Sequence, residues 1–261
     1  MTAHGDHGTD SASNRVHGYD VIRGFSVASM VAFHLCYDLA YIYGVSMPWF
    51  ASPLQDVWRA SISWTFLLVA GIMCSYSRSN LRRAAKYLGV ALLVFIATTL
   101  AAVDTPINFG IIYCMGFSTL CAHLYLKLAG RASAKTNALL AIMLAVAFLL
   151  CLGIPTGTLG LKAWGGPFVR IPATPYASGM LSWLGFPGPH FASGDYYPPL
   201  PFTLLFLAGT SLGVIIRKKG APKALARLTC RPLEFIGRHA LPIYVAHQPL
   251  VLVILMLVFG R

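Results

Sequence analysis

Ionisable residues are concentrated on one face of the first apolar segment. With 3.6 residues per helical turn, Asp20, Arg23, His34 and Asp38 fall on a single stripe. Eleven residues separate Arg23 from His34, so the imidazole is expected about 16 Å further along the helix. Ionisable groups at membrane depth are costly and usually mark a site that binds or reacts. The stripe therefore predicts a chemical site.

The last apolar segment carries a second set of polar residues. Arg238 precedes it, and His247 and Gln248 lie two to three turns inside it. Pro249 follows directly, and a proline within a membrane helix frees backbone groups that are tolerated where they line a cavity. The polar residues that we expect to contact a substrate are Tyr113, Asn108, Asp195 and Gln248.

A positively charged inner mouth followed by a buried imidazole suits a donor with an anionic head and a distant reactive end. Acyl-coenzyme A has this form. Arg23, together with Arg238 and Asp20, is expected to hold the donor, because guanidinium groups bind phosphates bidentately. His34 is expected to act as general base, with Asp38 one turn away as its partner. His247 completes the predicted catalytic group.

Composition indicates that these residues lie in a membrane protein. Apolar residues make up 57% of the chain and charged residues 11%, whereas soluble domains carry roughly 25% charged residues. A bilayer core needs about 20 apolar residues in helical form. The fold class is therefore an all-α polytopic membrane helix bundle. Its seven predicted spans are 20–44, 57–77, 84–103, 107–129, 137–154, 199–217 and 240–260.

The basic residues predict the orientation of these spans. Short cytoplasmic loops collect Lys and Arg. With the N-terminus inside, sixteen of the twenty basic residues lie in inner segments, and Arg59, Lys162, Arg170 and Arg261 are outside. We therefore expect a multi-pass protein of the plasma membrane with its C-terminus outside. Residues 1–18 are interpreted as a disordered cytoplasmic tail, residues 19–261 as one domain, and residues 155–198 as an extracytoplasmic loop.

Charge and cysteine content narrow the range of partners. The net charge of +12 is explained by topology, so no nucleic acid partner is predicted. The six cysteines show no paired spacing and are interpreted as reduced packing residues. No metal is expected. The partners that remain are the lipid bilayer and a small-molecule or glycan acceptor, and the oligomeric state is open.

Several segments resemble a known family. Asp20-Val-Ile-Arg23-Gly24 and His34-Leu-Cys-Tyr37-Asp38-Leu are similar to segments in bacterial relatives of heparan-α-glucosaminide N-acetyltransferase. The spacing of Arg23 and His34 also resembles acyltransferase-3 proteins. Further matching segments are Asn108-Phe-Gly-Ile-Ile-Tyr113-Cys-Met-Gly116, Asp195-Tyr-Tyr-Pro198-Pro-Leu-Pro201 and Gly237-Arg238-His-Ala-Leu-Pro-Ile-Tyr244-Val-Ala-His247-Gln248-Pro249.

The resemblance covers residues 17–258 and implies a membrane-embedded acyltransferase. It would move an acyl group, such as acetyl, from cytosolic acyl-coenzyme A to a sugar, glycan or lipid-linked acceptor by O- or N-acylation. It also implies that His34 is the catalytic histidine and Arg23 the arginine on the donor side. Bacterial members often have His where this chain has Tyr113.

Three other functions fit the same residues. A proton-coupled transporter or flippase would use His34, Asp38 and His247 as a proton relay. A membrane scaffold would use the polar stripe as a helix-packing seam. A metal enzyme would require the same three side chains to converge, although their spacing matches no common metal motif.

Overall fold

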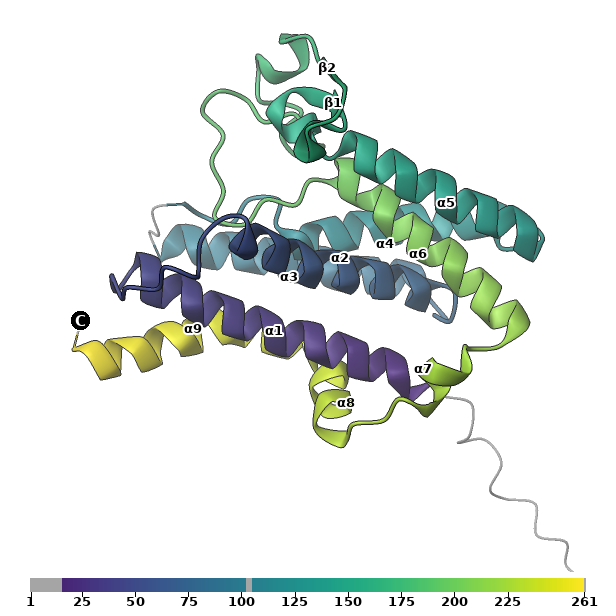
Figure 1. The fold of residues 1–261 in the computed structure, drawn as a ribbon, viewed down its shortest axis with the longest axis horizontal. Coiled ribbons are helices and arrows are strands. Elements are labelled where there is room, and N and C mark those ends of the chain that lie inside the picture. Colours follow the sequence, from purple (N-terminus) through teal and green to yellow (C-terminus); the bar gives the residue numbers. More distant parts are fainter. Residues whose placement is uncertain (1–15, 102–104, 261) are drawn as a thin grey trace, which may run out of the picture.

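A computed structural model describes residues 16–101 and 105–260, and its architecture is a bundle of long helices (Figure 1). Residues 1–15 of the predicted tail and Arg261 lie outside the described part. The long helices are α1 (His17–Tyr41), α2 (Leu54–Cys74), α3 (Asn80–Leu100), α4 (Ile111–Ala129), α5 (Ala134–Cys151), α6 (Pro199–Lys219) and α9 (Ala240–Phe259). Two shorter helices, α7 (Lys223–Arg227) and α8 (Arg231–Arg238), connect α6 to α9.

Within the described residues, six of these helices are long and apolar enough to cross a membrane: α2 to α6 and α9. We count α1 as a seventh span, because 25 residues extend over about 37 Å. Its polar side chains are directed inward: Asp20 is 4% exposed and Asp38 is 1% exposed. The predicted all-α polytopic bundle is confirmed, and each helix lies within a few residues of its predicted span.

The segments that the sequence assigns to the inner side meet at one end of the bundle. Arg217, near the end of α6, donates to the carbonyl oxygen of Ser75 after α2 at 2.8 Å. The ammonium group of Lys218 reaches the carbonyl oxygen of Ala132 between α4 and α5. His17 at the start of α1 pairs with Glu234 of α8. Successive helices therefore begin and end alternately at this end of the bundle, as the distribution of basic residues predicts.

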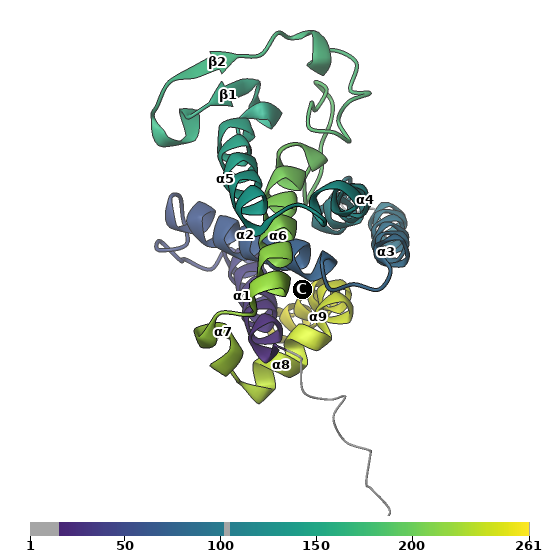
Figure 2. The same cartoon turned by 90° about the vertical axis from the view of Figure 1, so that its right-hand side faces the viewer.

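Helix α6 lies at the centre of the bundle, between α5, α2 and α4 (Figure 2). Small residues permit its close approach to α2, as is common in membrane helix pairs. A Cβ atom on Gly71 would lie 2.0 Å from the carbonyl oxygen of Phe206, and one on Gly209 would lie 2.2 Å from that of Leu68. Helix α3 packs mainly on α4 and leaves most of its apolar surface exposed to lipid.

The long connection between α5 and α6 contains the only strands in the described residues. They are β1 (Thr158–Gly160) and β2 (Phe168–Arg170), which pair antiparallel beyond the C-terminal end of α5 (Figure 1). Three single-turn 3-10 helices accompany them: η1 (Ile154–Thr156), η2 (Lys162–Trp164) and η3 (Thr174–Tyr176). Trp164 and Phe168 remain about half exposed, as is typical of aromatic residues at a membrane interface.

Candidate functional site

Two imidazole rings from opposite ends of the sequence meet inside the bundle. The ring centroids of His34 on α1 and His247 on α9 are 4.9 Å apart. His247 is 8% exposed, whereas His34 is only partly buried. Neither ring nitrogen of His34 has a hydrogen-bond partner in the part of the chain that the structure describes, so this ring is available to a ligand.

The register between these helices is set by the packing of α8 on α1. A Cβ atom on Gly237 would lie 1.9 Å from the carbonyl oxygen of Asp20, and one on Gly24 would lie 1.9 Å from that of Leu233. This backbone contact holds the start of α9 beside the first turns of α1. Helix α9 then runs alongside α1 (Figure 1), which brings its third turn to His34.

The hydrogen bond of His247 fixes which nitrogen carries its proton. Its Nδ1 atom lies 2.6 Å from the carbonyl oxygen of Tyr244, which can only accept. The neutral ring must therefore donate from Nδ1, which leaves Nε2 as an acceptor. Nε2 is buried and has no partner among the described residues. A buried acceptor of this kind is suited to a proton or a donor group from a substrate.

Asp38 pairs with Gln248 and not with His34, which corrects the predicted His34–Asp38 pair. The side-chain amide of Gln248 donates to both carboxylate oxygens of Asp38, at 2.9 and 3.2 Å. Helix packing accounts for the difference, because the 1%-exposed carboxylate faces α9, where an amide can satisfy both oxygens. The pair ties α1 to α9 one turn beyond His34 on α1 and directly after His247 on α9. The metal-enzyme hypothesis requires Asp38 to bind a metal together with His34 and His247. The hydrogen bonds from Gln248 to both carboxylate oxygens argue against that arrangement.

A third polar group lies at the outer end of α4. Asp195 Oδ2 accepts from the backbone nitrogen of Ile111 at 3.0 Å and from the hydroxyl of Tyr244 at 3.3 Å. The carboxylate thus caps the positive end of α4 from another segment. Burial raises the pKa of the Asp195 carboxyl, while both hydrogen bonds act in the opposite direction. Tyr244 connects this group to the imidazoles, because its ring centroid is 5.6 Å from that of His247.

Asn108 and Tyr113 lie beside this cap and face a cavity between α3, α4 and α9. Ser193 joins the two chain segments here, because its hydroxyl donates to the carbonyl oxygen of Asn108 at 2.8 Å. Phe109, which follows Asn108, has a positive φ of 55°. This conformation is uncommon for a bulky residue and costs about 1–3 kcal/mol. Such strain is often found at ligand sites.

Replacing Asp195 with alanine is expected to destabilise the folded protein by about 1–3 kcal/mol. The reason is that Ile111 N–H and the Tyr244 hydroxyl would lose their shared acceptor in a buried position. The measurement is the free energy of unfolding in mixed detergent micelles. Asp56→Ala is the matched control, because among the described residues Asp56 pairs only with exposed Arg59. Equal losses in the two variants would show that Asp195 is not a structural cap.

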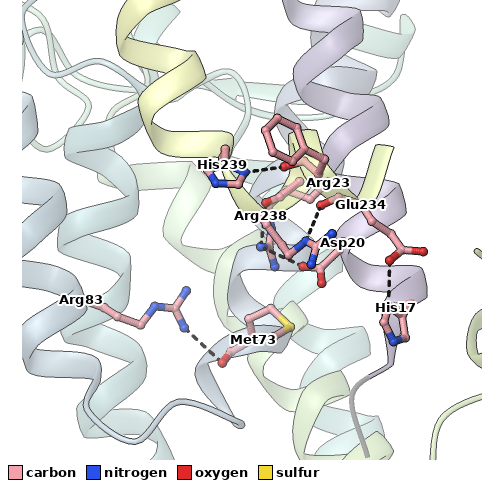
Figure 3. Close-up of polar contacts among 10 residues, drawn as sticks. His17, Asp20, Arg23, Met73, Arg83, Glu234, Arg238 and His239 are labelled. Atoms are coloured by element: carbon pink, nitrogen blue, oxygen red, sulfur yellow. Dashed lines mark hydrogen bonds and ion pairs between the residues drawn. The ribbon is translucent and has the colours of Figure 1, made fainter. Parts of the chain in front are cut away.

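The predicted donor-side residues meet where α1 contacts α8 (Figure 3). Arg23 donates to the carboxylate of Asp20 at 3.4 Å and to the carbonyl oxygen of Gly237 at 3.2 Å. Arg238 donates from Nε to the carbonyl oxygen of Glu234 at 3.3 Å. The hydrogen bond from His17, at 2.8 Å, lowers the pKa of the Glu234 carboxyl. These contacts orient two guanidinium groups at the inner end of the bundle.

Arg83 of α3 is an inner-end residue that the sequence interpretation counted only as a topology signal. Its guanidinium turns inward and donates to the carbonyl oxygen of Met73 at 3.1 Å, as Figure 3 shows. It also lies 6.0 Å from the centroid of the Tyr87 ring. Its neighbours Arg82 and Lys86 are exposed. The sequence does not show that Arg83, and neither Arg82 nor Lys86, turns inward, because all three lie in one basic cluster.

The sequence-predicted residues therefore form two groups about 16 Å apart along α1. Arg23, Asp20 and Arg238 lie at the inner end. The second group lies deeper and toward the outer side, and its members are His34, Asp38, His247, Gln248, Asp195, Asn108 and Tyr113.

Comparison with known proteins adds a family to this geometry. Residues 15–249 match the family model described as heparan-alpha-glucosaminide N-acetyltransferase, catalytic. The matched range includes both imidazoles, the Asp38–Gln248 pair and the arginines of the inner end. No curated protein and no solved structure matches the chain.

Proposed function

The chain belongs to the heparan-alpha-glucosaminide N-acetyltransferase catalytic family, and we propose that it transfers an acyl group from cytosolic acyl-coenzyme A to an acceptor with His34 as general base. Family membership identifies a multi-pass membrane protein of acetyltransferase type. The proposal adds the donor, the base, a plasma-membrane location and an inner end that faces the cytoplasm. The acceptor classes are a sugar, a glycan or a lipid-linked group.

The observation that carries the proposal is the His34–His247 contact at 4.9 Å. In the reaction, His34 takes a proton from a hydroxyl or amine of the acceptor. The oxygen or nitrogen of that acceptor group attacks the thioester carbonyl. The new C–O or C–N bond forms, the C–S bond breaks, and the thiolate of coenzyme A leaves and takes up a proton. His247 limits the charge on this pair, because two imidazolium rings at this distance repel each other.

The inner end supports the donor part of the proposal. Arg23 and Arg238 are oriented by backbone carbonyl groups, and Arg83 is turned toward the bundle. Coenzyme A has phosphates at one end and its thioester at the other end of a long arm. Phosphates held at the inner end therefore allow the thioester to reach toward His34 between the helices. Acidic side chains are sparse here, with Asp20 and Glu234 already hydrogen-bonded.

Replacing Arg83 with glutamine is expected to weaken acetyl-coenzyme A binding about tenfold or more. A charge-assisted hydrogen bond contributes about 1.5–3 kcal/mol, and 1.4 kcal/mol corresponds to tenfold. The measurement is calorimetric titration of the protein in lipid nanodiscs. Lys86→Gln is the control, since it removes an exposed charge from the same helix. Similar weakening by both changes would indicate a general charge effect and no phosphate contact at Arg83.

A transfer assay tests the function as a whole. Purified protein in nanodiscs is given acetyl-coenzyme A labelled in the acetyl group, together with extracts of membrane lipid and surface glycan. We expect free coenzyme A thiol and a labelled acceptor in equal amounts. Uptake of a solute driven by a pH gradient, with no consumption of acetyl-coenzyme A, would contradict the proposal and support a proton-coupled transporter.

A further inference from the structure

A cavity of about 300 Å³ lies between α3, α4 and α9. Its walls are mainly apolar and include Leu88, Leu92 and Phe95 from α3 and Phe109 and Ile112 from the start of α4. Small-molecule pockets measure roughly 300–1,000 Å³, so the cavity can hold a chain of several carbon atoms. None of these five residues belongs to the catalytic pair.

The polar side chains of this cavity are grouped on the side of the outer end of α4. Asn108, Tyr113 and Tyr244 supply them. The hydroxyl of Tyr113 has no hydrogen-bond partner within residues 16–101 and 105–260, whereas that of Tyr244 donates to Asp195. Tyr244 also contacts His247. The cavity thus runs from an apolar region to a polar wall that includes Tyr244, the residue whose ring contacts that of His247.

The other side of the cavity faces the hydrocarbon region of the membrane. Leu92 is 58% exposed and Phe95 is 39% exposed, and both belong to α3, which packs mainly on α4 and is otherwise largely exposed. In a membrane-spanning helix, such exposed apolar side chains contact lipid tails. A ligand that enters between them must therefore come from the bilayer. An entering hydrocarbon chain would find an apolar wall, while its polar head group would find Tyr113 and Asn108.

We propose that this cavity binds the hydrocarbon chain of a lipid acceptor and places its hydroxyl or amine head group beside Tyr244 and the imidazole pair. The inference rests on the proposed function and narrows its acceptor to a lipid. The head group loses its proton to the imidazole pair, and the acyl carbon bonds to its oxygen or nitrogen. The C–S bond of the thioester breaks, and the coenzyme A thiolate takes up a proton and leaves as the thiol. Donor and acceptor would then approach His34 from the inner end and from the bilayer.

Photochemical labelling tests the cavity without requiring catalysis. Full-length protein in nanodiscs is exposed to a long-chain primary alcohol that carries a diazirine in its chain, and labelled peptides are mapped by mass spectrometry. We expect saturable labelling around Leu88–Phe95 and Asn108–Tyr113, which excess unlabelled alcohol removes. Labelling elsewhere on the lipid-facing surface should rise in proportion to probe concentration. Non-saturable labelling at the cavity would overturn the inference.

Two neighbouring leucines provide a matched pair of variants. Leu92 lines the cavity and is 58% exposed, whereas Leu93 is 57% exposed and does not line it. Leu92→Trp is expected to reduce saturable labelling about tenfold by filling the entrance, and Leu93→Trp to leave it unchanged. Ala91→Phe, which fills the cavity from another wall residue, should repeat the loss. Equal labelling of Leu92→Trp and Leu93→Trp would overturn the inference.

The outcomes for the cavity and for the proposed function are separable. Saturable labelling without acyl transfer in any assay would support the lipid site and contradict the acyltransferase. Transfer to a water-soluble acceptor without saturable labelling would support the acyltransferase and contradict the lipid site. Transfer to a long-chain alcohol with a KM raised in Leu92→Trp, and an unchanged KM for acetyl-coenzyme A, would support both.

Discussion

Replacing His34 with alanine is expected to lower the rate of acyl transfer by about 10²–10⁴-fold, which is the range that general-base catalysis usually contributes. The structure brings this ring to 4.9 Å from His247 and leaves its nitrogens available to a ligand. Its loss would remove the group that takes the acceptor proton. The measurement is kcat for release of the coenzyme A thiol by purified protein in nanodiscs.

Two controls separate this effect from damage to the fold. His123→Ala removes a histidine from α4, which lies outside the imidazole pair, and should leave kcat unchanged. Binding of acetyl-coenzyme A by His34→Ala should also be unchanged, because the inner-end arginines lie about 16 Å away. If His34→Ala retains the wild-type rate, the base is another residue, and His247→Ala becomes the decisive variant.

Replacing Gly24 with leucine is expected to prevent most of the protein from folding. Even a Cβ atom at this position would lie 1.9 Å from the carbonyl oxygen of Leu233, a backbone atom that cannot move without separating α8 from α1. Overpacking against movable side chains already costs about 1–3 kcal/mol, so a contact with backbone should cost more. The measurement is the yield of monodisperse protein in detergent and its thermal unfolding temperature.

A milder change at the same contact links the fold to the site. Gly237→Ala is expected to destabilise the protein and to lower acyl transfer, because α8 sets the position at which α9 begins. Gly89→Ala in α3 is the control, since a Cβ atom there meets nothing within 4 Å. In that position, alanine should stabilise the helix by up to about 1 kcal/mol. Wild-type stability in Gly237→Ala would contradict the close α1–α8 packing.

The helical part of the fold follows from the sequence because each helix is a local structure. An apolar run of about 20 residues has to satisfy its own backbone in lipid, so length and hydropathy predict the span directly. The span predicted at 199–217 is α6, Pro199–Lys219. The first span is the exception to simple hydropathy, since α1 carries Asp20, Arg23, His34 and Asp38 and is recognised by its period.

The site was only partly predictable, because local patterns identify its residues but do not identify their contacts across helices. The stripe on α1 and the residues His247 and Gln248 were identified from their types and depth, and the structure brings them together. The predicted pairing of Asp38 with His34 is wrong, because sequence spacing identifies neighbours on one helix and not those on a facing helix. Arg83 was missed because the sequence of a basic cluster does not show which of its side chains turns inward and which are exposed.

The sequence alone determined a helical membrane protein, the approximate ends of its spans and the face of α1 that carries the ionisable groups. These depend on composition and on a period of 3.6 residues, which act over one or two turns. Only the tertiary structure decided that His34 meets His247, that Gln248 holds Asp38, and that a cavity opens beside Tyr244. These contacts join residues about 130 to 210 positions apart, and their register depends on the backbone contact of Gly24 and Gly237 with neighbouring helices.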